Sequence, residues 1–157
     1  MLFRSEILLD TFRDQRSAFY FATNPAGAYV DGLVFGDAQL NTDWDAIWQV
    51  RTKRSDQGWV AEFAIPFKSL SFPADRRIWG FNVARNIRRR VEDARWSGAQ
   101  LRTDFQQVSE AGEITFLGGT LSQGIGLDVR PFIAGNWLHV RSIRTDDYKR
   151  KPGLDLF

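Results

Sequence analysis

Residues 59–73 read WVAEFAIPFKSLSFP, and this stretch decides the fold class. Five apolar side chains fall on alternate positions from Trp59 to Phe67, so an extended chain would turn all five to one face. Pro66 has no amide hydrogen to donate to a neighbouring strand, so the strand must end, bulge or lie at a sheet edge there. The stretch therefore predicts a half-buried β-strand that stops at Pro66 and continues as a helical turn over residues 67–70.

The same period-two alternation recurs along the chain and predicts further strands, two pairs of which flank short Gly-containing loops and form hairpins. The segments with this pattern are residues 7–12, 19–24, 28–30, 47–53, 59–65, 78–90, 94–98 and 113–117. We expect residues 78–90 to form a long antiparallel strand buried on one face only. The only other helical segment expected is 41–46. Many short strands with regular turns predict an all-β chain, arranged as an antiparallel β-sandwich.

The composition is that of a folded domain with an unusually high aromatic content. The chain has 157 residues, of which 43% are hydrophobic and 25% are charged, and these values allow a core. Phe, Trp and Tyr make up 14% of the residues, which favours β-structure and either a bulky core or aromatic recognition surfaces. The chain has no Cys, so disulfides and thiolate sites are excluded. We find no signal-peptide pattern and no apolar run of the roughly 20 residues that a membrane helix needs.

Charge is distributed unevenly along the chain. Residues 1–50 carry three Arg against seven Asp and Glu, whereas residues 76–95 carry seven Arg against two acids. The formal net charge is nevertheless only +2. A nucleic-acid-binding protein usually has a broader basic surface and a recognisable motif. We therefore predict no nucleic-acid partner and interpret the basic stretch as a solvated strand face.

Four segments together resemble a known family. LLDTFRDQRSAFYFATNPAGAYVDG (8–32), TDWDAIWQV (42–50), GWVAEFAIPFKSLSF (58–72) and WGFNVARNIRR (79–89) resemble the family 9 type of carbohydrate-binding module. The closer resemblance is to the version that precedes a β-barrel domain of unknown function in large bacterial outer-membrane-associated proteins. It covers roughly residues 5–117, and PGLDLF at 152–157 resembles the entry to the barrel.

This resemblance implies a domain organisation and a location. Residues 1–117 would be the C-terminal portion of a jelly-roll-like carbohydrate-binding sandwich, and residues 118–157 a linker and the start of the barrel. In the family, several strands come before the first motif, so we expect a fragment that exposes a sheet edge near residues 5–12 and associates through it. The parent protein would lie in the periplasm or outer membrane of a Gram-negative bacterium. The chain would contact the membrane only through the barrel.

The function implied by the resemblance is non-catalytic binding of a glycan or polysaccharide by a protein linked to carbohydrate breakdown or uptake. One alternative is a structural or docking module of an outer-membrane β-barrel protein that binds no sugar. A second alternative is a fragment of a hydrolase that acts on glycosidic bonds. An exposed pair of aromatic rings in a groove would favour sugar binding over docking.

Sugar recognition needs flat aromatic faces with planar polar side chains around them, and five residues are candidates. They are Trp44, Trp48, Tyr29, Asp31 and Trp96. Trp44 and Trp48 would present both rings on one face if their segment were helical, whereas Trp48 would point into the core if a strand begins at Ile47. Tyr29 and Asp31 would line a rim or belong to a solvated turn. The exposure of Trp96 is left open by its position in a short strand.

We predict no cofactor, no metal site and no catalytic residue in this chain. If a metal did bind, Ca²⁺ would suit the loop carboxylates, although their spacing is not that of an EF-hand. These carboxylates are Asp10, Asp14, Asp31, Asp43 and Asp45. A glycosidase needs two carboxylates that face each other across a cleft, and the sequence singles out no such pair. The one histidine, His139, lies in the segment after the sandwich, so no Ser-His-Asp arrangement is proposed.

Overall fold

The computed structural model describes residues 4–36, 38–87, 90–99, 102–118 and 121–122, and the backbone of residues 134–141 and 148–155. The chain divides into two compact units, Met1–Gly126 and Leu127–Phe157. The first unit continues past the boundary predicted after residue 117, because Leu121 is buried in its core.

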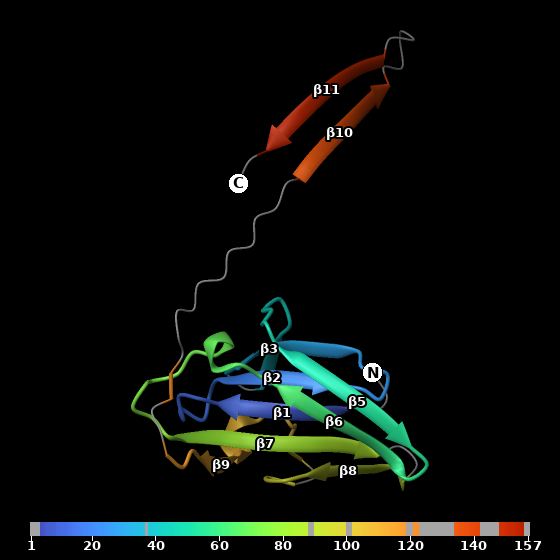
Figure 1. Ribbon diagram of the computed structural model, residues 1–157. Coiled ribbons are helices and arrows are strands. Elements are labelled where there is room, and N and C mark those ends of the chain that lie inside the picture. The colour runs from blue at the N-terminus through green and yellow to red at the C-terminus, as the bar shows by residue number, and fades with distance from the viewer. Residues whose placement is uncertain are drawn as a thin grey trace. The chain divides into compact units, whose positions relative to one another are not determined.

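The first unit is built on a larger antiparallel sheet of seven strands (Figure 1). The strand order is β4-β3-β2-β1-β7-β8, and β9 pairs with β7 beside β8. The strands are β1 (Ser5–Asp10), β2 (Ala18–Thr23), β3 (Tyr29–Phe35), β4 (Gln39–Asn41), β7 (Ile78–Ile87), β8 (Glu92–Arg95) and β9 (Gly112–Thr115). The predicted all-β, antiparallel class is confirmed.

Strand β1 lies inside the sheet, between β2 and β7. Its residues pair with β2 from Ser5 opposite Thr23 onward, and with β7 from Ser5 opposite Arg85 to Asp10 opposite Gly80. The prediction of an exposed edge near residues 5–12 is therefore wrong. The sequence could not reveal this, because the β1–β7 pairing joins residues that are 70 to 80 positions apart.

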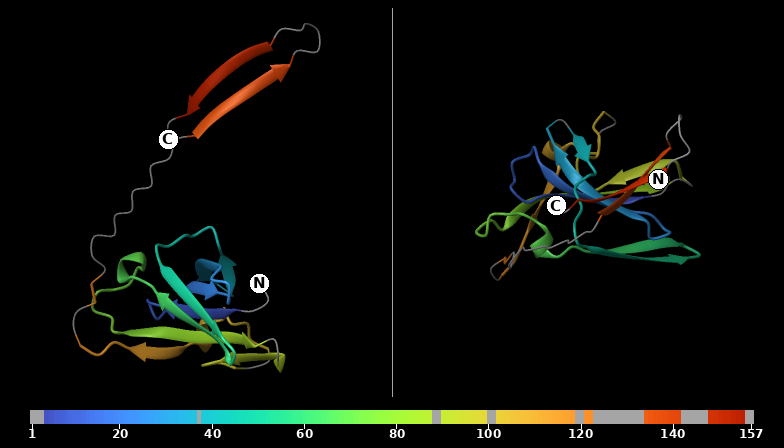
Figure 2. Two further views of the ribbon diagram at one scale, coloured as in Figure 1. Left: turned by 45° about the vertical axis from the view of Figure 1, so that its right-hand side comes forward. Right: turned by 90° about the horizontal axis from the view of Figure 1, so that it is seen from above.

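A second sheet consists of the hairpin β5 (Gln49–Ser55) and β6 (Gly58–Ala64). It crosses one face of the larger sheet, as the two views of Figure 2 show. The alternation that predicted β6 is confirmed, since its residues are half-buried and exposed in turn. Phe63 packs with Phe21 and Trp79 of the larger sheet in one apolar cluster. Two antiparallel sheets packed face to face are consistent with a β-sandwich.

The opposite face of the larger sheet is covered as well. Phe105 and Val108, from the segment that contains the 3₁₀ turn η3 (Val108–Glu110), pack with Leu8, Tyr20 and Ala84 in a second cluster. The prediction that residues 78–90 are buried on one face only is therefore wrong. On β7, Trp79 faces the first cluster and Ala84 the second, and both are buried.

The two predicted helical segments differ in outcome. Residues 67–69 form the 3₁₀ turn η1 (Phe67–Ser69) directly after Pro66, as predicted. Residues 42–48 carry no helix, so that prediction is wrong. The segment is held by side chains instead, because the Asp31 carboxylate accepts the Ala46 amide and the Asn41 side chain accepts the Asp43 amide. Neither described helical turn is long and apolar enough to cross a membrane.

The second unit contains an antiparallel hairpin of β10 (Ala134–Arg141) and β11 (Tyr148–Asp155). Its register places Trp137 opposite Pro152 and His139 opposite Arg150. Both strands lie in the segment 118–157, which the resemblance assigns to a linker and the start of a barrel. Its assignment to the start of a barrel stays a prediction.

Candidate functional site

A polar cavity of about 350 Å³ lies on the face that Phe105 covers, at the end of the sheet where β1 begins. Its lining comes from β1, β7, β8 and the segment before η3. The residues are Arg4, Glu6, Ala84, Arg85, Asn86, Asp93, Arg95, Asp104, Phe105 and Gln106. Most of these residues carry planar polar groups, and Phe105 is the one aromatic residue among them.

Glu6 forms the buried centre of this cavity. Its side chain is only 5% exposed, and its carboxylate is paired with Arg4 Nε at 2.9 Å. Tyr20 Oη donates a second hydrogen bond to Glu6 at 2.6 Å. Burial, together with the charge of Glu6, raises the pKa of Tyr20 above its ordinary value. The Glu6 side chain is therefore held in place by two partners, the charged Arg4 and the polar Tyr20.

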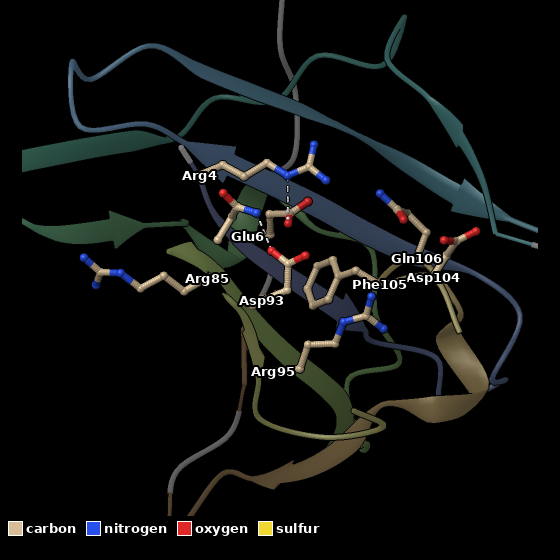
Figure 3. A pocket seen from close by; sticks show the side chains of 10 residues that line it. Arg4, Glu6, Arg85, Asp93, Arg95, Asp104, Phe105 and Gln106 are labelled. Atoms are coloured by element: carbon tan, nitrogen blue, oxygen red, sulfur yellow. Dashed lines mark hydrogen bonds and ion pairs between the residues drawn. The ribbon is translucent and has the colours of Figure 1, made fainter. Parts of the chain in front are cut away.

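The other polar groups come from neighbouring positions on β7 and β8. The Asn86 side chain donates to Asp93, and Asn86 and Asp93 also face each other in the strand register. Arg95 donates to the carbonyl of Thr103 at 2.5 Å, which ties β8 to the covering segment. Figure 3 shows the Asp93 and Arg95 side chains directed toward Glu6 and Phe105. The cavity thus alternates guanidinium and carboxylate groups.

Arg85 lines this cavity by position but directs its side chain elsewhere, as Figure 3 shows. Its guanidinium lies over the Trp59 ring, with Cζ 4.5 Å from the ring centroid, and donates to the Trp59 carbonyl. This cation–π contact fastens the second sheet to β7. Its positive charge therefore supports the fold rather than a ligand in the cavity.

One acceptor in this cavity has no protein partner in the described part of the chain. Asn86 Oδ1 is buried and receives no hydrogen bond, while the amide nitrogen of the same side chain is bonded to Asp93. A buried acceptor without a donor costs free energy unless water or a ligand supplies one. Asn86 Oδ1 is therefore an unsatisfied acceptor buried behind the charged groups of the cavity.

Trp44 and Trp48, the predicted aromatic pair, pack in different surroundings. Trp48 is 6% exposed and lies in the core, where it stacks on Phe63 and meets Phe21 edge to face. Trp44 is half-buried, with its ring 5.1 Å from that of Phe19. The structure follows the core alternative for Trp48, whose ring offers no open face to a ligand.

Tyr29 and Asp31 also differ in exposure. Tyr29 is 58% exposed, with its ring edge to face against Trp48 at 5.1 Å. Asp31 is buried, and its carboxylate accepts the Ala46 amide at 2.6 Å. Asp31 is therefore engaged in holding the 42–48 segment, and only Tyr29 presents a surface at this rim.

Trp96 is the other predicted residue whose ring is exposed. It is 55% exposed and packs on Phe81 with ring centroids 5.5 Å apart. A Cβ added at Gly112 would lie 2.4 Å from Trp96 Cζ3, so the indole lies against the glycine backbone. One side of the indole is therefore supported by the protein, and a large part of its surface is open to solvent.

Two of the loop carboxylates considered for Ca²⁺, those of Asp10 and Asp14, are used in local structure. Asp10 accepts the amides of Asp14 and Gln15, and Asp14 accepts the hydroxyl and amide of Ser17. Burial raises the pKa of Asp10 despite these bonds. Burial alone would raise the pKa of Asp14, but hydrogen bonds from the Ser17 hydroxyl and from the Ser17 and Arg16 amides outweigh it and lower that pKa. Among the described residues, no three His, Asp or Glu side chains gather in a way that could hold a metal ion.

Comparison of the chain with protein-family models, with curated proteins and with solved structures finds no match. The resemblance to a family 9 carbohydrate-binding module therefore rests on the four sequence segments alone.

Sequence reasoning missed the polar cavity. Its residues lie between positions 4 and 106, and each alone is typical of a solvated strand or loop. The one available signal was the cluster of planar polar residues at 85–95, which was assigned to a solvated face. Only the β1–β7 register brings Arg4 and Glu6 to that cluster.

Proposed function

We propose that this chain is a non-catalytic carbohydrate-binding module that takes one saccharide unit in the polar cavity. The observation that carries the proposal is the convergence of guanidinium, carboxylate and amide groups around a cavity of about 350 Å³. Such a volume lies at the lower end of the range for small-ligand pockets. The wider setting we propose is a cell-envelope protein of a Gram-negative bacterium, linked to carbohydrate breakdown or uptake.

The chemistry of the cavity supports a polyhydroxylated ligand. Each sugar hydroxyl is both a donor and an acceptor, so adjacent hydroxyls suit a surface where guanidinium donors alternate with carboxylate acceptors. Phe105, whose ring is buried in the second cluster, closes one side of the cavity. A ligand without hydroxyls would leave these polar groups desolvated and unpaired.

A glycan array of the full chain, followed by calorimetry with the best ligand, tests the proposal. Asp104→Asn removes an exposed cavity carboxylate and should weaken binding by about tenfold, the value expected for one charge-assisted hydrogen bond. Asp75→Asn is the matched control, because Asp75 is also exposed and lies outside the cavity. Binding that is absent from the array, or equal loss in both variants, would overturn the proposal.

The exposed indole of Trp96 gives a second contact to test. If a longer glycan also stacks on this ring, Trp96→Ala should weaken its binding while leaving a monosaccharide unaffected. Tyr29→Ala tests the remaining exposed ring among the predicted residues in the same way. Retained affinity in both variants would confine recognition to the cavity.

The docking alternative has one observation in its favour. Val60 and Ile47 are exposed apolar side chains, on β6 and just before β5. If no glycan binds, a structural or docking role becomes the better reading. Release of reducing ends from any bound glycan would instead favour the hydrolase alternative.

A further inference from the structure

Another open cavity of the first unit lies at the opposite end of the β1–β7 pair from the polar cavity. It is a groove of about 550 Å³, lined by Arg13, Gln15, Arg76, Arg77 and Ile78. These five residues carry three positive charges and no negative charge. We propose that this groove binds an oxyanion group, a carboxylate or a sulfate, of an acidic polysaccharide.

One wall of the groove is a loop held in an unusual conformation. Arg13 and Gln15 have positive φ angles of 49° and 59°, which non-glycine residues rarely adopt. The Asp10 carboxylate, buried beneath the loop, accepts the Asp14 and Gln15 amides at 3.2 and 2.9 Å. Thr11 Oγ1 donates to the Ser71 carbonyl at 2.5 Å. The loop is thus fixed by the fold, and it presents Arg13 and Gln15 in set positions.

The other wall is the turn that leads into β7. The Arg76 amide donates to the Pro73 carbonyl at 3.0 Å, and the Arg77 carbonyl accepts the Phe116 amide at 2.9 Å. These bonds fix the backbone and leave the two exposed side chains to line the groove. The Arg76 guanidinium also donates to the Phe12 carbonyl, which joins the two walls.

The charges explain why an anion is the fitting ligand. Arg13 is paired with Glu113 of β9, and both side chains are about half exposed. Arg76 donates to an uncharged carbonyl, so that contact neutralises nothing. Guanidinium groups that share a groove repel one another unless an anion lies between them. Their planar donors match a carboxylate or sulfate in a two-point hydrogen bond, and Gln15 adds an amide donor.

The ligand is assigned to a polysaccharide because the same unit also carries the polar cavity, which we propose binds a saccharide. The choice of a polysaccharide rests on the proposed function, whereas the oxyanion site itself depends only on the groove. A chain with both hydroxyls and acidic groups would use both surfaces. A nucleic acid carries oxyanions too, and it therefore enters the test as a competing polyanion.

Calorimetry of the full chain with four polymers at low salt tests the assignment. Polygalacturonate is compared with its methyl ester, and dextran sulfate with dextran, so that the two members of each pair share a sugar backbone and only one carries acidic groups. We expect binding of at least one charged polymer, little binding of its neutral counterpart at the groove, and weakening as salt rises. Equal affinity for charged and neutral polymers, or no binding of either charged polymer, would overturn the proposal.

Variants locate the binding. Arg77→Gln should weaken binding of the charged polymer by about tenfold, and Arg51→Gln, an exposed arginine of β5, should leave it unchanged. Equal effects of these two substitutions would show that the groove is not the site. Duplex DNA that binds as tightly as the polysaccharide, with the same loss in Arg77→Gln, would show a general polyanion surface and overturn the assignment. Asp104→Asn affects only the polar cavity, so the two proposals can fail separately.

Discussion

Tyr20→Phe tests the buried contact on which the polar cavity is built. Tyr20 is 2% exposed, and its hydroxyl donates to the carboxylate of Glu6 at 2.6 Å. Phenylalanine fills the same space apart from the hydroxyl, so the change removes one hydrogen bond to a charged acceptor. Such bonds stabilise a fold by about 1.5–3 kcal/mol. We expect Tyr20→Phe to lower the free energy of unfolding by about 2 kcal/mol at pH 7.

The pH dependence gives this prediction a signature that simple packing loss would lack. Burial and the Glu6 carboxylate raise the pKa of Tyr20 in the folded state. The stabilisation is therefore fully present below about pH 10, the ordinary value for tyrosine. It is lost above that pH, because only the unfolded chain then ionises at this residue. At about 1.4 kcal/mol per pH unit, the difference between the two proteins should fall below about 1 kcal/mol by pH 11.

Urea unfolding followed by tryptophan fluorescence at pH 7 and pH 11 measures both values. Tyr29→Phe is the matched control, since that tyrosine is exposed and should change stability by less than about 0.5 kcal/mol. Our reasoning fails if Tyr20→Phe is as stable as the original chain at pH 7. It also fails if the loss is the same at both pH values.

Three further substitutions probe the second cluster, the support of Trp96 and the loop beside the groove. Phe105→Ala should lower the free energy of unfolding by about 3–5 kcal/mol in urea, because the ring is buried in the cluster that covers β1 and β7. Gly112→Ala should cost about 1–3 kcal/mol through its contact with Trp96, and close to nothing in a Trp96→Ala background, as a double-mutant cycle would measure. Asp14→Asn should destabilise the chain most at neutral pH and least below about pH 4, because hydrogen bonds from Ser17 and the amides lower the pKa of Asp14. A deficit that thermal unfolding finds unchanged between pH 7 and pH 3 would contradict the last of these.

The elements whose chemistry is local could be predicted from the sequence. The Pro25-Ala26-Gly27 loop and the Ser55–Gly58 turn each close a hairpin between neighbouring strands, and both hairpins form as expected. Pro66 follows the end of β6 and precedes η1. It has no amide hydrogen to donate to a neighbouring strand, so its effect on the strand is local and can be read from the sequence. In each case the deciding residues lie within a few positions of one another.

The failures all involve contacts between distant segments. Residues 41–46 are predicted to be helical, but residues 42–46 form no helix, and the buried Asp31 carboxylate accepts the Ala46 amide instead. The alternation on β7 indicated one buried face, and nothing near it in the sequence shows that Phe105 covers the other. Asn82, predicted to face solvent, is 2% exposed and donates to the Ser97 carbonyl.

The positions of the candidate sites are explained by the fact that both faces of the larger sheet are covered. Because the second sheet lies on one face of the larger sheet and the 102–111 segment on the other, its centre is closed to ligands. The two polar cavities lie at the ends of the β1–β7 pair, one near Ser5 opposite Arg85 and the other near Asp10 opposite Gly80. Five residue steps of extended chain separate these ends by about 17 Å. A single sugar in the polar cavity therefore leaves the arginine groove free, and only a polymer could occupy both.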